Sequence, residues 1–77
     1  MKKGMRIILL TGTGCEPCDG AKDALKGYIE RGEIEVLNVK DSDEAADLYL
    51  QGKFDSVPQL LVLSKTGQIF AQLPIEE

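Results

Sequence analysis

Two cysteines, Cys15 and Cys18, stand between a short aliphatic run and a helical pattern, and this junction constrains the fold more than any other feature. The run from Arg6 to Leu10 is continuously apolar after its first residue, which is typical of a strand buried on both faces. After the cysteines, apolar residues recur at helical spacing: Ala21, Ala24, Leu25, Tyr28 and Ile29. Pro17 suits the first turn of such a helix, because its missing N–H leaves no bond unmade. The segment predicts a strand, a tight turn bearing both cysteines, and a helix that stops at Gly32.

A second strand–helix unit is predicted to follow. Alternating apolar residues in 34–39 favour a strand. Asp41 is suited to cap the next helix, with Glu44 reaching back to the start of the helix. The apolar face of this helix comprises Ala46, Tyr49 and Leu50. We expect the helix to end near Gly52.

The last part of the chain predicts a β-hairpin. Leu60–Leu63 and Ile69–Leu73 favour strands, and Ser64–Gly67 between them has hairpin-turn chemistry. The element order is therefore β-α-β-α-β-β. The first two strands should be parallel with a right-handed crossover, and the last two antiparallel. We expect one α/β domain over residues 1–77, a mixed four-stranded sheet with helices on its faces.

Length and charge exclude several function classes. A chain of 77 residues has room for one domain. A net charge of −4 argues against binding the phosphate backbone of nucleic acids, and the lack of histidine excludes imidazole catalysis. The apolar run Ile7–Leu10 is too short for a signal peptide, and no stretch is long enough to span a membrane. We expect a cytoplasmic protein.

The spacing of the two cysteines suits thiol–disulfide chemistry. At the start of a helix, unpaired N–H groups and the helix dipole favour the thiolate of Cys15, the reactive form of a cysteine. Cys18 lies one turn further on, where it is more buried and can attack Cys15 to resolve a mixed disulfide. Two other interpretations stay open: inert structural cysteines, and a metal shared between two chains, since one chain lacks four conventional zinc ligands.

With Val57-Pro58 before a later strand, the motif Cys15-Glu16-Pro17-Cys18 resembles the glutaredoxin and thioredoxin families of thiol–disulfide oxidoreductases. The resemblance spans residues 5–73 and implies a thioredoxin fold. It implies that Pro58 is a cis proline facing the disulfide, and that the backbone of Val57 pairs with substrate as an added strand. Glu16 and Pro17 complete the expected substrate-binding set.

The sequence departs from these families in two places that bear on the electron donor. Thr11 to Gly14 lack the lysine of glutaredoxins and the tryptophan of thioredoxins before the motif. Gly67 to Ile69 do not match the segment with which glutaredoxins grip glutathione. We expect no bound cofactor, and the donor stays open between glutathione or another small thiol and a reductase similar to thioredoxin reductase.

We expect the last helix of the family to be missing, because only Pro74 to Glu77 follow the last predicted strand. That helix would cover part of the sheet face shared with the first helix, so apolar side chains there would stay exposed. Exposed apolar patches mark interfaces, and we expect a homodimer through this face.

Charges beside the motif predict the redox direction. Glu16 and Asp19 both oppose a thiolate nearby, while Lys22 offsets them in part. Opposing the thiolate makes a dithiol a better reductant. The sequence therefore predicts reduction of protein disulfides. The alternative is a non-catalytic module of the same fold that serves in binding or in redox sensing. A dimer is one form that such a module could take.

Four further residues have structural expectations. Tyr28 and Tyr49 fall on the apolar stripes, so we expect both in or beside the core. Gly12 and Gly14 serve either a close approach of substrate or a tight turn, and the sequence does not distinguish the two.

Overall fold

The computed structural model describes residues 6–73. The expectation of a missing last helix falls on residues 74–77, which lie outside the described residues. The elements are β1 (Arg6–Thr11), α1 (Glu16–Ala24), α2 (Lys26–Glu30), β2 (Glu35–Asn38), α3 (Asp43–Gln51), β3 (Gln59–Leu63) and β4 (Ile69–Leu73). Within this part of the chain, no helix is long and apolar enough to cross a membrane.

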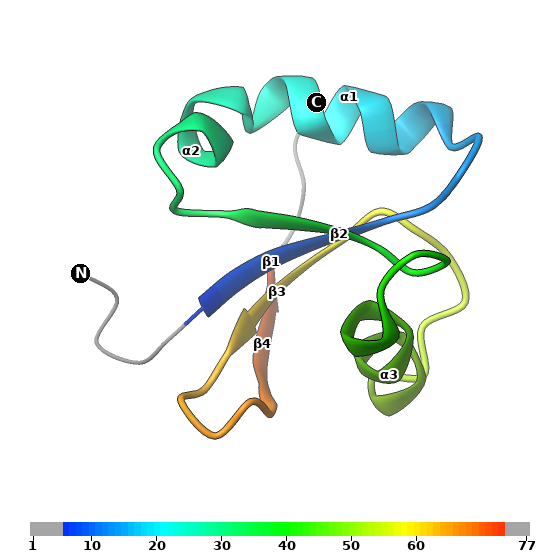
Figure 1. Cartoon of the computed structure of the whole chain (residues 1–77), viewed down its shortest axis with the longest axis vertical. Helices are drawn as coiled ribbons and strands as arrows, with labels where there is room; N and C mark the ends of the chain where they lie inside the picture. Colours follow the sequence, from blue (N-terminus) through cyan, green and yellow to red (C-terminus); the bar gives the residue numbers. More distant parts are fainter. Residues whose placement is uncertain (1–5, 74–77) are drawn as a thin grey trace.

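The four strands form one mixed sheet in the order β2-β1-β3-β4. β1 is parallel to β2, with Leu9 opposite Val36, and antiparallel to β3. β3 and β4 are antiparallel, and a bulge interrupts their pairing next to Leu63. Figure 1 shows α1 and α2 on one face of the sheet and α3 on the other. The predicted strand directions and the mixed α/β sheet are confirmed.

Each face of the sheet carries its own apolar cluster, because successive side chains of β1 point to opposite faces. One cluster packs beneath α3 and contains Ile8, Leu10, Ala45, Leu48, Leu61 and Leu63. The other packs beneath α1 and contains Leu9, Ala21, Ile34 and Leu60. The prediction that the continuous apolar run forms a strand buried on both faces is therefore confirmed for β1.

The first helix is interrupted, contrary to the single helix that the apolar stripe predicts. Leu25 has φ −104° and ψ 15°, which ends α1 and begins α2. The N–H of Leu25 still donates to the carbonyl of Ala21, and the N–H of Ile29 donates to the carbonyl of Leu25. The bend therefore preserves the apolar spacing while changing the direction of the chain, so the pattern alone does not reveal it.

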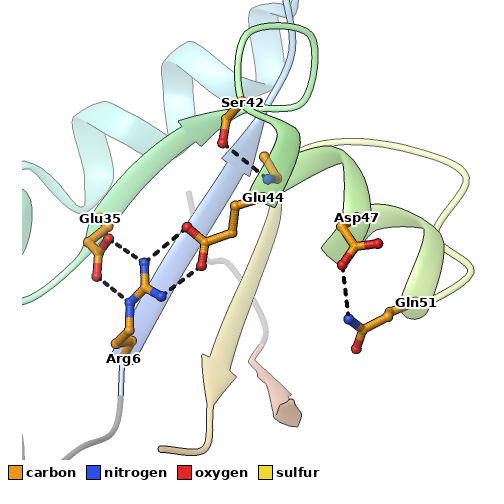
Figure 2. A network of polar contacts seen from close by, with 7 residues as sticks. Arg6, Glu35, Ser42, Glu44, Asp47 and Gln51 are labelled. Atoms are coloured by element: carbon orange, nitrogen blue, oxygen red, sulfur yellow. Dashed lines mark hydrogen bonds and ion pairs between the residues drawn. The ribbon is translucent and has the colours of Figure 1, made fainter. Parts of the chain in front are cut away.

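The cap of α3 is Ser42, and the expectation that Asp41 caps this helix is wrong. Ser42 Oγ accepts a hydrogen bond from the N–H of Ala45 at 3.2 Å. Glu44 does not reach back to the helix start; it binds Arg6 at the beginning of β1 (Figure 2). The helix ends at Gln51 with Gly52 as its C-cap, so the predicted end near Gly52 is confirmed.

Arg6 joins three elements through two carboxylates, as Figure 2 shows. Its guanidinium donates from Nε and Nη2 to Glu35 of β2, both at 2.8 Å, and from Nη1 to Glu44 of α3 at 2.7 Å. These hydrogen bonds, first to Glu35 and then to Glu44, raise the pKa of Arg6 above its usual range. All three side chains are partly exposed, so the network contributes modestly to stability and mainly fixes α3 against the start of the sheet.

An open apolar pocket of about 230 Å³ lies on the same face of the sheet as α1 and α2, between α2 with its flanking residues and the strands. Its lining includes Ile7, Leu25 and Leu60, with Leu73 at the edge strand and Tyr28 at the rim. Tyr28 is 49% exposed and stacks beneath the Arg31 guanidinium, so its expected place in the core is wrong. Tyr49 is half-buried and packs against the α3 cluster, as expected. The pocket lies on the face proposed for dimerisation, and the dimer stays a prediction.

Two glycine substitutions should separate crowding at α3 from helix propensity at α2. A Cβ at Gly52 would overlap the Phe54 ring, which packs against the α3 cluster. Gly52→Ala should therefore lower the free energy of unfolding by about 1–3 kcal/mol. A Cβ at Gly27 would meet only the flexible tip of Arg31 at 3.4 Å. Gly27→Ala should therefore raise the free energy of unfolding by about 0.5–1 kcal/mol. Urea unfolding measures both, and equal stability of the two variants would contradict this packing.

Candidate functional site

The two cysteines form a disulfide at the start of α1. Cys15 is the N-cap residue, and its Sγ accepts a hydrogen bond from the N–H of Cys18 at 3.0 Å. The Cα atoms of the pair are 5.2 Å apart, within the usual range for a disulfide. One of the four unpaired N–H groups of a helix start is thus aimed at the Cys15 sulfur.

The end of β1 and a short loop set the position of this helix start. Thr11 is buried, and its hydroxyl donates to the carbonyl of Leu37 at 3.3 Å, while its own carbonyl accepts from the N–H of Val39 at 2.9 Å. Gly14 then turns the chain with φ +69°, a conformation that favours glycine. β1 is therefore fixed to β2 immediately before the loop that carries Cys15.

The two sulfurs differ in their access to solvent. Cys18 is 1% exposed and belongs to the buried core, whereas Cys15 is only half-buried. Pro17 occupies the first turn of α1, as the sequence predicts, and is exposed. The arrangement leaves one sulfur open to a partner and places the second behind it within bonding distance.

The loop between α3 and β3 brings Val57 and Pro58 to the disulfide. The Val57–Pro58 peptide bond is cis, and both residues are half-buried. The carbonyl oxygen of Val57 lies 3.7 Å from Cys15 Sγ. Residues that are 42 positions apart in the chain thus meet at the sulfur that the sequence singled out.

Gly12 and Gly14 have different roles. A Cβ built on Gly12 would lie 3.1 Å from Cγ2 of Val57, so Gly12 permits a close approach. A Cβ on Gly14 would meet nothing, so Gly14 serves the turn. The contact between Gly12 and Val57 is the feature of the site that sequence reasoning missed, because no local pattern links the two positions.

The charged residues of the motif lie on the surface. Glu16 and Asp19 are exposed in the first turn of α1, where acidic side chains suit the helix dipole. Lys22 pairs with Asp19 at 3.7 Å, with both side chains well exposed. In residues 6–73, no group of three or more His, Cys, Asp or Glu side chains is placed to hold a metal ion.

No family model and no curated protein matches the sequence. Solved structures do match the fold. Thioredoxin from Wuchereria bancrofti superposes with a TM-score of 0.66 at 17% identity, covering 92% of this chain and 68% of that one. A thioredoxin-fold protein from Helicobacter pylori gives 0.66 at 17%, covering 97% and 62%. Mitochondrial thioredoxin 3 from Saccharomyces cerevisiae gives 0.61 at 19%, covering 96% and 69%.

These matches place most of this chain on about two thirds of each of those three proteins. The mixed sheet and the helices on its two faces match their shared architecture. The chain therefore has a thioredoxin fold, with a cysteine pair at the start of its first helix.

Proposed function

We propose that this protein reduces disulfide bonds of other proteins by dithiol–disulfide exchange at Cys15 and Cys18. The observation that carries this proposal is the asymmetry of the pair. Cys15 is half-buried and accepts an N–H at the helix start, and Cys18 is buried behind it at bonding distance. A structural disulfide has no need for one open sulfur that receives a hydrogen bond suited to a thiolate.

The first step begins from the reduced protein. The Cys15 thiolate attacks one sulfur of the substrate disulfide, so a Cys15–substrate bond forms and the substrate S–S bond breaks. The second substrate sulfur leaves as a thiolate and takes a proton from water. The N–H of Cys18, 3.0 Å from Cys15 Sγ, stabilises the attacking thiolate.

The second step releases the substrate. Cys18 gives its proton to water and attacks Cys15 Sγ, so the intramolecular disulfide forms and the Cys15–substrate bond breaks. The first substrate sulfur leaves as a thiolate and takes a proton from water. Two electrons and two protons have then passed to the substrate. The burial of Cys18 keeps it from reacting with disulfides in solution, so it acts on the mixed disulfide alone.

Docking of the substrate involves the residues around Cys15. An extended substrate segment pairs with the backbone of Val57 beside Pro58, as an added strand. Glu16 and Pro17 directly follow Cys15 and are exposed. In this proposal they contact the same substrate segment. The 3.7 Å separation of the Val57 carbonyl from Cys15 Sγ brings such a segment within reach of the attacking atom.

Regeneration needs an external donor, because the cycle ends with the protein oxidised. A reductase similar to thioredoxin reductase, or a low-molecular-weight thiol such as glutathione, supplies two electrons, with no cofactor held by this chain. A reducing compartment such as the cytoplasm fits this direction of flow.

Removal of the resolving thiol should trap the substrate. Cys18→Ser in its reduced form should accumulate a mixed disulfide between Cys15 and insulin, because the second step has no attacking sulfur. Wild-type protein should reduce insulin with a donor present, and Cys15→Ser should do neither. Non-reducing gels and mass spectrometry check these outcomes. Absence of both turnover and trapping would favour the non-catalytic module instead.

Alkylation should distinguish the two thiols of the reduced protein. Iodoacetamide under native conditions should modify Cys15 at least about tenfold faster than Cys18, because Cys18 is 1% exposed. Mass spectrometry of peptides after a time course measures both rates, and unfolding in guanidinium should make them equal. Equal rates in the folded protein would rule out the assigned roles.

Exposed acidic charge should keep the reduction potential low. We expect a potential closer to the roughly −270 mV of thioredoxin than to the roughly −120 mV of strong periplasmic oxidants. Glu16→Gln should raise it by about 10 mV, because losing a nearby negative charge favours the thiolate. Glu30→Gln, at the far end of α2, is the control and should leave it unchanged. Glutathione redox titration tests both, and a strongly oxidising wild type would contradict the proposal.

A further inference from the structure

We propose that Gly12 is a positioning residue for Cys15: its lack of a side chain lets Val57 sit against the end of β1, and Val57 in turn holds its carbonyl oxygen beside Cys15 Sγ. This inference rests on the proposed function, since it concerns how that site sets the reactivity of its attacking sulfur. It assigns a role to a residue outside the cysteine motif.

Space, and not backbone conformation, accounts for glycine at position 12. Among residues 6–73, the glycines with positive φ are Gly14, Gly32 and Gly67. The backbone of Gly12 does not have a positive φ. A Cβ at Gly12 would lie 3.1 Å from Cγ2 of Val57, closer than ordinary van der Waals contact. Any side chain at this position therefore has to move Val57.

Val57 has little freedom to yield by rotating its side chain. It packs against the α3 cluster, and its β-branched side chain has a restricted χ1. The following Pro58 also restricts the backbone of Val57. A push on Cγ2 is therefore passed in part to the backbone, including the carbonyl group.

The carbonyl of Val57 and the N–H of Cys18 act on Cys15 in opposite senses. The N–H lies 3.0 Å from Sγ and favours the thiolate. The carbonyl oxygen lies 3.7 Å from Sγ, where it accepts the S–H of the protonated form and repels the thiolate. The position of Val57 thus sets the fraction of Cys15 that is ionised at a given pH.

Gly12 and Cys15 belong to the same loop between β1 and α1, so a displacement of Val57 away from Gly12 also separates its carbonyl from Sγ. The charged groups nearest in sequence to these contacts are Glu16, Asp19 and Lys22 of α1 and Asp55 of the preceding loop, all exposed. They are the same in every variant below, so they do not account for differences between variants.

A double-mutant cycle tests the coupling through Val57. The rate of Cys15 alkylation by iodoacetamide is measured from pH 5 to 9 in reduced wild type, Gly12→Ala, Val57→Ala and the double variant. Gly12→Ala should raise the rate at pH 6 about threefold and shift the profile to lower pH, because the carbonyl has moved away from the thiolate. In the Val57→Ala background, which lacks Cγ2, the same substitution should change the rate by less than about 1.5-fold.

Gly27→Ala, in α2, is the matched glycine control and should leave the alkylation profile unchanged. An equal effect of Gly12→Ala in both backgrounds, or none in either, would overturn the proposal. If Gly12→Ala is too unstable to assay, recovery of folding in the double variant supports the contact, and equal instability of both overturns it.

The alkylation readout does not depend on turnover. If the wild type does not reduce insulin but Gly12 and Val57 are coupled in the alkylation assay, the proposed function is contradicted and the positioning role of Gly12 is supported. Loss of the coupling with insulin reduction intact would do the reverse.

Discussion

The burial of β1 on both faces is the constraint on which the rest of the structure depends. β1 pairs with β2 on one side and β3 on the other, and its successive side chains enter the two apolar clusters beneath α3 and α1. A central strand held in this way has little freedom along its length or across the sheet. Its end at Thr11 is tied to β2 by two hydrogen bonds, so the loop that follows starts from a fixed point. The positions of Gly12 and Cys15 follow from that point.

Around Cys15, fixed dipoles matter more than formal charges. The Cys18 N–H and the Val57 carbonyl lie 3.0 and 3.7 Å from the sulfur, whereas the charged side chains of the motif are solvated. Solvent and salt weaken the effect of exposed charges, and they weaken a buried or half-buried dipole much less. In the proposed mechanism, the loop after β1 and the loop before β3 therefore affect the sulfur more than Glu16 or Asp19 does.

The sequence predicted the elements whose signals are local. The strands, the parallel and antiparallel pairings and the cysteines at the helix start all depend on neighbouring residues or on connection length. All are confirmed, with the strand limits within one residue of those predicted. The sequence did not predict the bend at Leu25, because the apolar stripe continues through it. Ser42 and Asp41 are adjacent residues of equal capping capacity, so only the hydrogen bond to Ala45 distinguishes them. Tyr28 is exposed because no element covers that edge of the pocket among the described residues, which periodicity cannot report.

The contact between Gly12 and Val57 shows why a site is harder to predict than its motif. The Cys-x-x-Cys spacing is visible in four consecutive residues, and it identifies the reacting atoms. In the proposed site their reactivity also depends on the Val57 carbonyl, which the chain brings from 42 positions away by returning through α3. Gly12 would be ordinary in a loop, but in the proposed site it affects the chemistry because Val57 packs against it. In a chain this short, the parts that shape the sheet and the parts that tune the sulfur are adjacent, so a substitution made for one acts on the other.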